Sequence, residues 1–137
     1  MEAATNKREL FRLLDANINR LREGIRVVED VARYLLDEAE LAAKLKSLRH
    51  AARLDSLNHE LLASRDSVGD VARVTTTSET VRPDLRALVA ANCKRAEESA
   101  RVLEEALKLV DATEAERFKG IRYALYDLEK RLLLHFS

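Results

Sequence analysis

Four polar residues of the types that grip phosphates stand in two matching pairs. Asn17 and Arg20 in the first part of the chain are matched by Asn92 and Arg95, each 75 positions further on. An arginine side chain donates two parallel hydrogen bonds to a phosphate or a carboxylate, and an asparagine side chain offers both a donor and an acceptor. If the two pairs face each other, they form one donor-rich site, so we predict phosphate contacts for both arginines and substrate contacts for both asparagines.

The recurrence around these residues is wider, and it keeps polar residue types rather than only apolar ones. Five of the seven recurring types are polar or charged, although a helix needs only its apolar face to be kept. A purely structural interpretation stays open for the charged members, because Arg26 with Glu29 and Arg101 with Glu104 have the spacing of local ion pairs, worth about 0.2–0.5 kcal/mol each. The recurring pairs are Ala16/Ala91, Asn17/Asn92, Arg20/Arg95, Glu23/Glu98, Arg26/Arg101, Val27/Val102 and Glu29/Glu104.

Two neighbours of these residues are further candidates for substrate binding. Gly24 stands inside a predicted helix, where glycine costs roughly 1 kcal/mol relative to alanine, which suggests that a backbone or a ligand approaches closely there. Lys94 precedes Arg95 and adds a cation. Two adjacent basic residues are too few for a nucleic-acid surface, and the net charge of zero gives no general attraction to nucleic acid.

The stretch RDSVGD combines a cation with two carboxylates in a predicted loop, which runs from Ser64 to Thr80 without a sustained helical period. Arg65 is placed to reach a phosphate, while Asp66 and Asp70 are placed to share a Mg²⁺, which proteins bind through one or two carboxylates together with substrate phosphates. We expect the loop to close over the phosphates and bring the metal with it. The alternative is a solvated connector, because Asp and Gly are also ordinary turn residues.

Four helices are needed to position these residues, and the spacing of apolar side chains predicts all of them. The first begins near Asn6, the second is capped by Asp37 with Glu40, the third has Pro83 in its first turn, and the fourth is capped by Thr113 with Glu116. The second is expected to run on as far as Leu61. The apolar stripes of the first and third helices are Leu14, Ile18, Leu21, Ile25, Val28, Ala32 and Leu35, and Val89, Cys93, Ala96, Ala100, Leu103, Leu107 and Val110.

The recurrence extends to the second helix of each half, since LKSLRHAA at 45–52 resembles FKGIRYAL at 118–125. We therefore predict an all-α fold, a helical bundle from two duplicated long helical hairpins related by a pseudo-twofold axis. It forms a single helical domain over 1–137, with repeat one at 6–63, the loop at 64–80 and repeat two at 81–136. Beside each apolar stripe runs a second row of residues, which starts with the matching Asn and Arg and becomes apolar further along the helix. Such a row should be partly covered by another surface. Because a second subunit could cover it, a homodimer is the expected assembly.

Several other classes of protein are disfavoured. Cys93 is the one cysteine, so no internal disulfide forms, and its place on an apolar stripe predicts a core residue. No stretch approaches the roughly 20 apolar residues of a membrane span, and the N-terminus lacks the apolar core of a signal peptide, so a cytoplasmic location is expected. The chain has neither a GxxxxGK[ST] nor a GxGxxG loop, and its three histidines form no metal-ligand pattern.

Taken together, the segments LLDANINRLREGIRVVED, RDSVGDV, ANCKRAEESARVLEE and RYALYDLEK resemble the small helical hydroxymethylpyrimidine phosphate kinases of thiamin biosynthesis. In other members of that family this unit precedes a thiamin phosphate synthase barrel, so the resemblance implies a free-standing form with the synthase as a possible partner. It also implies transfer of the ATP γ-phosphoryl group to the phosphate of 4-amino-2-methyl-5-hydroxymethylpyrimidine phosphate, but not to the free alcohol, with ATP as co-substrate and Mg²⁺ as cofactor.

That reaction would suit the candidate residues. Its nucleophile is an ionised phosphate oxygen, which needs no general base, so catalysis consists of cations and a metal ion placed around the phosphates. Arg20, Arg95 and Arg65 would then be the catalytic cations. Two alternatives remain: a non-catalytic helical partner or oligomerisation module of thiamin phosphate synthase, and a small-molecule sensor without turnover.

Overall fold

The computed structural model describes residues 6–75 and 81–136, and this part of the chain consists of helices with no strand, which confirms the predicted all-α class. The end of the predicted loop, 76–80, lies outside the described residues, as do 1–5 and 137. The elements in chain order are α1 (Lys7–Asp30) with a π-helical turn (Val31–Leu35), α2 (Ala39–Ala51), a 3₁₀ turn (Asp55–Leu57), α3 (Asn58–Ser64), α5 (Leu85–Leu107), α6 (Ala112–Leu133) and a 3₁₀ turn (Leu134–Phe136).

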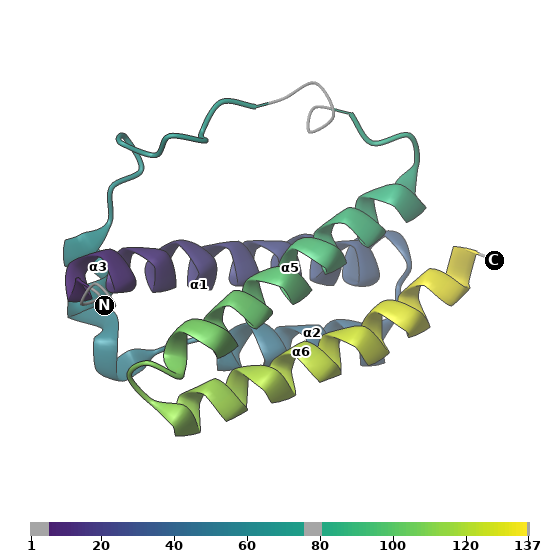
Figure 1. Ribbon diagram of the computed structural model, residues 1–137. Helices are drawn as coiled ribbons and strands as arrows, with labels where there is room; N and C mark the ends of the chain where they lie inside the picture. The colour runs from purple at the N-terminus through teal and green to yellow at the C-terminus, as the bar shows by residue number, and fades with distance from the viewer. Residues whose placement is uncertain (1–5, 76–80, 137) are drawn as a thin grey trace.

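The four long helices form two hairpins whose first helices cross each other (Figure 1). Helix α1 turns back into α2, α5 turns back into α6, and α1 packs against α5. Helices α2 and α6 lie on one side of the α1–α5 crossing, while the described parts of the connection, 65–75 and 81–84, lie on the opposite side (Figure 1). The crossing therefore has one face towards the core and one face towards the connection.

The core forms where the predicted apolar stripes meet. Leu14, Leu21 and Ile25 on α1 are fully buried, as are Leu103 and Leu107 on α5. Burial of such side chains is the main favourable contribution to folding, at about 25 cal/mol per Å² of apolar surface. Cys93 lies in this core, as predicted, and burial raises the pKa of its thiol to about 12. The two last members of the stripes are exposed instead, because the regular helix has ended before Leu35 and Val110.

Only one of the predicted helix caps is correct. Asn6 caps α1 by accepting a hydrogen bond from the Arg8 backbone nitrogen, as expected. The prediction for α2 was wrong, because Asp37 adopts a left-handed conformation with φ of 53° and the helix begins after Glu38. Aspartate tolerates that conformation better than most residues, so it serves here in the turn between α1 and α2.

The predicted starts of the other two long helices were also wrong. Asp84, not Pro83, begins α5, and its side chain accepts a hydrogen bond from the Ala87 nitrogen. At α6 the cap is Asp111, which accepts from the nitrogens of Thr113 and Glu114. A carboxylate at this position both satisfies free backbone N–H groups and interacts well with the positive end of the helix dipole.

The expectation of one continuous second helix as far as Leu61 was wrong as well, because α2 ends at Ala51 and the chain turns before α3. The carbonyl groups left free at that end have a partner from the other hairpin. The Arg117 guanidinium group on α6 donates hydrogen bonds to the backbone oxygens of Ala51 and Arg53. A side chain of α6 therefore completes the C-terminal end of α2.

Gly24 lies where α1 and α5 come closest, as its unfavourable place inside a helix suggested. A Cβ atom at Gly24 would stand 3.0 Å from the backbone oxygen of Asn92 and 3.3 Å from Cβ of Ala96. Because the nearest atom belongs to a helix backbone, it has little room to move aside. The group that approaches Gly24 closely is therefore the backbone of α5.

We predict opposite effects for alanine at the two glycines inside long helices. Gly24→Ala should lower the free energy of unfolding by about 1 kcal/mol, because crowding of the α5 backbone outweighs the gain in helix propensity. Gly120→Ala is the control: nothing lies within 4 Å of a Cβ there, so helix propensity should raise stability by about 0.5–1 kcal/mol. Urea denaturation measures both, and equal stabilisation would contradict the role given to Gly24.

Candidate functional site

Arg20 and Arg95 lie at the α1–α5 crossing, and both side chains are exposed. Arg20 is one helical turn from Gly24, and Arg95 is the neighbour of Ala96, which packs on that glycine. Within 6–75 and 81–136, neither guanidinium group has a hydrogen-bond or ion-pair partner. The residues next to these arginines on the same helix faces are covered where α1 and α5 cross, since Asn17, Gly24 and Ser99 are buried. Two free cations therefore stand at matching positions of the two hairpins.

The two asparagines make identical contacts, and these are local. The side-chain nitrogen of Asn17 donates a hydrogen bond to the Leu13 backbone oxygen at 2.9 Å, and that of Asn92 donates to the Leu88 oxygen at the same distance. Each amide nitrogen thus bonds one turn back on its own helix, a pattern common for polar side chains inside helices. Substrate contacts remain a prediction for the amide oxygens.

One of the two recurring pairs of glutamates, Glu29 and Glu104, has a structural explanation that the sequence analysis missed. Glu29 on α1 pairs with Arg49 on α2, with an Nε–Oε1 distance of 2.7 Å. Glu104 on α5 pairs with Arg122 on α6, with an Nη2–Oε1 distance of 2.8 Å. Each pair joins the two helices of one hairpin and is almost completely buried. A signal was present, because the two arginines occupy matching places in LKSLRHAA and FKGIRYAL. The duplication itself remains a prediction.

Burial and ion pairing act in opposite directions on the pKa of Glu29. Burial alone would raise the pKa of Glu29, but the hydrogen bond and the charge of Arg49 outweigh it and hold that pKa below its usual value. Of the two local pairs considered from the sequence, one forms, since Arg101 contacts Glu104 at 3.3 Å, whereas Arg26 contacts Asp30 at 3.4 Å in place of Glu29.

Arg65 is held in place rather than free. Its Nε and Nη2 atoms each lie 2.8 Å from a different oxygen of Asp15, a buried carboxylate on α1. This fork fixes the start of the connection on α1, and the hydrogen bond to Asp15 raises the pKa of Arg65. About half of the Arg65 side chain is exposed, and its Nη1 atom has no partner within the described ranges. A phosphate contact therefore stays a prediction for that one nitrogen.

The two loop carboxylates shape turns. Asp66 accepts a hydrogen bond from the Gly69 nitrogen at 2.7 Å, and Asp70 accepts from the Ala72 nitrogen at 3.0 Å. One oxygen of each has no partner in the described part of the chain. That part holds no group of three or more His, Cys, Asp or Glu residues able to bind a metal ion. A Mg²⁺ shared by the two carboxylates together with substrate phosphates therefore stays a prediction.

A pair of buried carboxylates between α5 and α6 is the feature that sequence reasoning overlooked. Glu97 is 3% exposed, and Glu129 contributes a second carboxylate. The Lys94 ammonium group lies 3.2 Å from Glu97 Oε1 and 3.3 Å from Glu129 Oε1. The Oε2 atoms of both glutamates are buried, without a hydrogen-bond partner among the described residues. Lys94, a predicted substrate-binding residue, thus serves two carboxylates at once.

This arrangement changes the protonation of Glu97. Burial, and next the nearby Glu129 carboxylate, raise the pKa of Glu97 to about 7. A like charge at close range disfavours ionisation of Glu97, so this carboxyl group holds a proton more strongly than an exposed glutamate does. The sequence signal was a charged residue inside an apolar stripe, because Glu97 follows Cys93 by one helical turn and both face α6.

Lys94 and Glu97 also line an open cavity of about 300 Å³, together with Glu98, Arg101 and Tyr126. Arg122 donates a hydrogen bond to the Tyr126 hydroxyl at 3.2 Å, and the Tyr123 ring meets the Tyr126 ring edge-on. These contacts orient the Tyr126 ring. The cavity therefore combines cations, a carboxyl group with a raised pKa and an aromatic ring.

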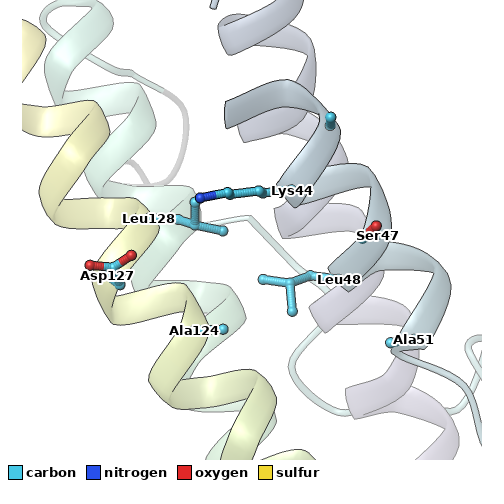
Figure 2. Close-up of a pocket in the computed structure, with 8 residues that line it drawn as sticks. Lys44, Ser47, Leu48, Ala51, Ala124, Asp127 and Leu128 are labelled. Atoms are coloured by element: carbon cyan, nitrogen blue, oxygen red, sulfur yellow. The ribbon is translucent and has the colours of Figure 1, made fainter. Parts of the chain in front are cut away.

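A second hollow of about 540 Å³ lies between α2 and α6 and is mostly apolar. Figure 2 shows Leu48 and Leu128 pointing into the space between the two helices. Lys44 at its edge is already paired with Glu40 at 3.0 Å. This groove suits apolar contacts rather than phosphate chemistry. Among the described helices, none is long and apolar enough to cross a membrane.

The chain is similar to proteins of one family. A model of the ThiD2 family matches residues 12–131. Proteins named thiamine-phosphate synthase are 46% identical in Synechocystis over 90% of this chain, 40% identical in Nostoc punctiforme over 92%, and 40% identical in Rhodopirellula baltica over 95%. The chain spans 36% of the length of each of these relatives. No solved structure matches. The matched segment contains both hairpins and their connection, and the chain belongs to the ThiD2 family.

Proposed function

We propose that this protein acts in thiamin biosynthesis by transferring the γ-phosphoryl group of ATP to 4-amino-2-methyl-5-hydroxymethylpyrimidine phosphate, which yields the pyrophosphate. The names of its relatives support a role in thiamin biosynthesis, and its resemblance to the small helical kinases supports the phosphoryl transfer. The observation that carries the proposal is the pair Arg20 and Arg95, two exposed guanidinium groups at the helix crossing without a partner in the described chain.

The proposed reaction joins two anions, so repulsion and alignment make up most of its barrier. Arg20 and Arg95 would neutralise the phosphates and hold them in line, because each can bond two oxygens at once. Gly24 contributes by letting α1 and α5 approach closely, which brings the two arginines to one crossing. The amide oxygens of Asn17 and Asn92 are available beside them for donor groups of the substrates.

The connection after α3 would cover this face. Its described parts lie on the side of the crossing away from α2 and α6 (Figure 1). Asp66 and Asp70 would hold the Mg²⁺ that accompanies the nucleotide, whose charge offsets that of the phosphates. Arg65, anchored by Asp15, would offer its remaining nitrogen to a phosphate. A covered site keeps water away from the transferred group.

The test is a variant series assayed for ADP formation with purified protein, ATP, Mg²⁺ and the pyrimidine phosphate. Arg20→Ala and Arg95→Ala should each reduce turnover at least about tenfold, which corresponds to one lost phosphate contact at about 1.4 kcal/mol. Lysine at either position should not restore full activity, because it cannot bond two oxygens in a fork. Arg86→Ala is the control, an exposed arginine in the first turn of α5. Normal turnover in both alanine variants would return the pair to a structural role.

A second candidate is a non-catalytic module that binds a second copy of the chain or thiamin phosphate synthase. The apolar groove between α2 and α6 favours it, because Leu48 and Leu128 present a surface that another helix could cover. A homodimer is expected for both the module and the kinase, so dimer formation alone does not distinguish them. A folded sample that forms no ADP, but scatters light as a species heavier than 15.5 kDa, would favour the module.

A further inference from the structure

We propose that the groove between the first half of α1 and the second half of α5 binds the pyrimidine ring of the phosphate acceptor, with Arg20 holding its phosphate at the inner end of the groove. This inference rests on the proposed function, because it assigns one substrate of that reaction to a site. The groove has a volume of about 560 Å³, within the range of small-molecule sites. Its apolar lining consists of Leu10, Leu13, Val102, Ala106 and Leu109.

The groove leaves large apolar side chains uncovered. Leu13, Val102 and Leu109 are 41%, 38% and 65% exposed, and they belong to two helices that diverge from their crossing (Figure 1). A flat ring lying on these side chains would remove apolar surface from water, which is the main favourable contribution to binding at such sites. Two charged residues of the lining, Arg101 and Glu105, pair with each other at 3.0 Å and so leave the apolar floor open.

Arg20 lies between the groove and the point where the two helices come closest. Leu13 is the last residue of α1 in the groove, and Gly24 marks the close approach of α5. Arg20 follows Leu13 by seven residues, which is about two helical turns, so both stand on the same side of α1, about 10 Å apart along its axis. Long side chains on a helix point back towards its N-terminus, which for Arg20 is the direction of the groove. Its guanidinium group therefore suits a phosphate at the inner end.

The length of the ligand favours the pyrimidine phosphate over ATP. In the pyrimidine phosphate one CH₂–O link joins the ring to the phosphate, whereas a ribose and two further phosphates separate adenine from the γ-phosphate of ATP. Because the Arg20 side chain spans part of the two turns to Leu13, the remaining distance suits the shorter ester. The methyl group of the ring suits the apolar floor. The Glu9 carboxylate at the rim has no partner within 6–75 and 81–136, and it would accept a hydrogen bond from the ring amino group.

The test is binding of the pyrimidine phosphate by calorimetry without ATP, so that no turnover is needed. The wild type should bind it at least about tenfold more tightly than inorganic phosphate, which has no ring for the groove. Val102→Gln should weaken binding of the pyrimidine phosphate at least about tenfold, because the ring would cover a polar amide, and should leave the affinity for ATP within about threefold.

Val27→Gln is the matched control. Val27 is 37% exposed, nearly the same as Val102, and occupies the matching position in the first half of the chain, but it does not line the groove. This variant should bind the pyrimidine phosphate within about threefold of wild type. Equal losses in the two variants would overturn the inference. The comparison of the two ligands on the wild type needs no variant, so a misfolded variant does not blur the outcome.

Other results would also overturn the ring site. They are no detectable binding to the wild type, equal affinity for the pyrimidine phosphate and inorganic phosphate, and a loss in Val102→Gln that affects ATP alone. Unchanged binding in a Val102→Gln variant that has lost a dimer present in the wild type would assign the groove to a second copy of the chain. A parallel assay for ADP separates the two proposals: ring binding that depends on Val102 without ADP would reject the kinase alone, whereas ADP formation with an unchanged KM for the pyrimidine phosphate in Val102→Gln would reject the ring site alone.

Discussion

Arg49→Ala should lower the free energy of unfolding by about 3–5 kcal/mol, the cost of leaving a buried charge without its partner. The Glu29 side chain is 3% exposed, and it accepts hydrogen bonds from Arg49 Nε at 2.7 Å and Nη2 at 3.3 Å. Without the guanidinium group, this carboxylate is either ionised and unpaired or forced to take up a proton. Arg122→Ala should have a smaller effect in the second hairpin, because Glu104 is also buried but keeps Arg101 as a partner at 3.3 Å. Urea denaturation at neutral pH measures both losses.

Two controls separate the loss of pairing from the loss of side-chain volume. The double variant Glu29→Leu with Arg49→Met removes both charges and should lie within about 1 kcal/mol of wild type, or above it, since apolar residues often replace a buried pair without loss. Arg131→Ala removes an arginine from an exposed pair with Asp127 and should change stability by less than about 1 kcal/mol. A double variant as unstable as Arg49→Ala would show that packing, not charge, explains the loss.

The second large effect concerns pH. Glu97 has a folded-state pKa of about 7 against an ordinary value of 4.5, so the folded protein holds a proton that the unfolded chain releases. Its contribution to stability is therefore fully present below pH 4.5 and is lost as pH rises to about 7. At roughly 1.4 kcal/mol for each pH unit, the difference between these two pKa values corresponds to roughly 3–4 kcal/mol.

Glu97→Gln removes this dependence while keeping the size of the side chain. The stability of the variant relative to wild type should therefore rise between pH 4.5 and pH 7 and stay constant above. The comparison is made as a difference because other carboxylates act in the opposite direction: the pKa values of Glu29, Glu40 and Glu105 are lowered in the folded protein. Thermal melts of both proteins from pH 4 to pH 8 measure it, and parallel curves would mean that folding does not raise the pKa of Glu97.

The helices could be predicted from the sequence because their apolar residues recur with the helical period, and burial of that stripe is what makes such segments helical. Their ends could not be predicted as well. Asp37 and Thr113 have the right residue type for a cap, and Pro83 has the right type for a first turn, but the caps lie one or two residues away at Glu38, Asp111 and Asp84. The choice depends on how the chain turns between packed helices, which local spacing does not contain.

Some residues of the candidate site could also be predicted from the sequence, and others could not. Arg20 and Arg95 stood out because the sequence repeats them, and Gly24 because a glycine inside a helix needs a reason. Glu97 and Glu129 are 32 positions apart in different helices, and Glu97 breaks the repeat, since Arg22 stands at its matching position. A contact between two helices that occurs in only one half of the chain cannot be predicted by comparing the two halves.

The hydrogen bonds from Arg117 to the end of α2 bear on cooperativity. Each buried ion pair lies within one hairpin, so by itself it would let the hairpins fold separately. Arg117 instead lets a side chain of the second hairpin supply the donors that the last turn of the first hairpin lacks. The end of α2 is then fully bonded only after α6 has docked, so α2 should fray from this end whenever α6 detaches. Loss of one hairpin thus weakens the other, and the two should unfold in a single transition.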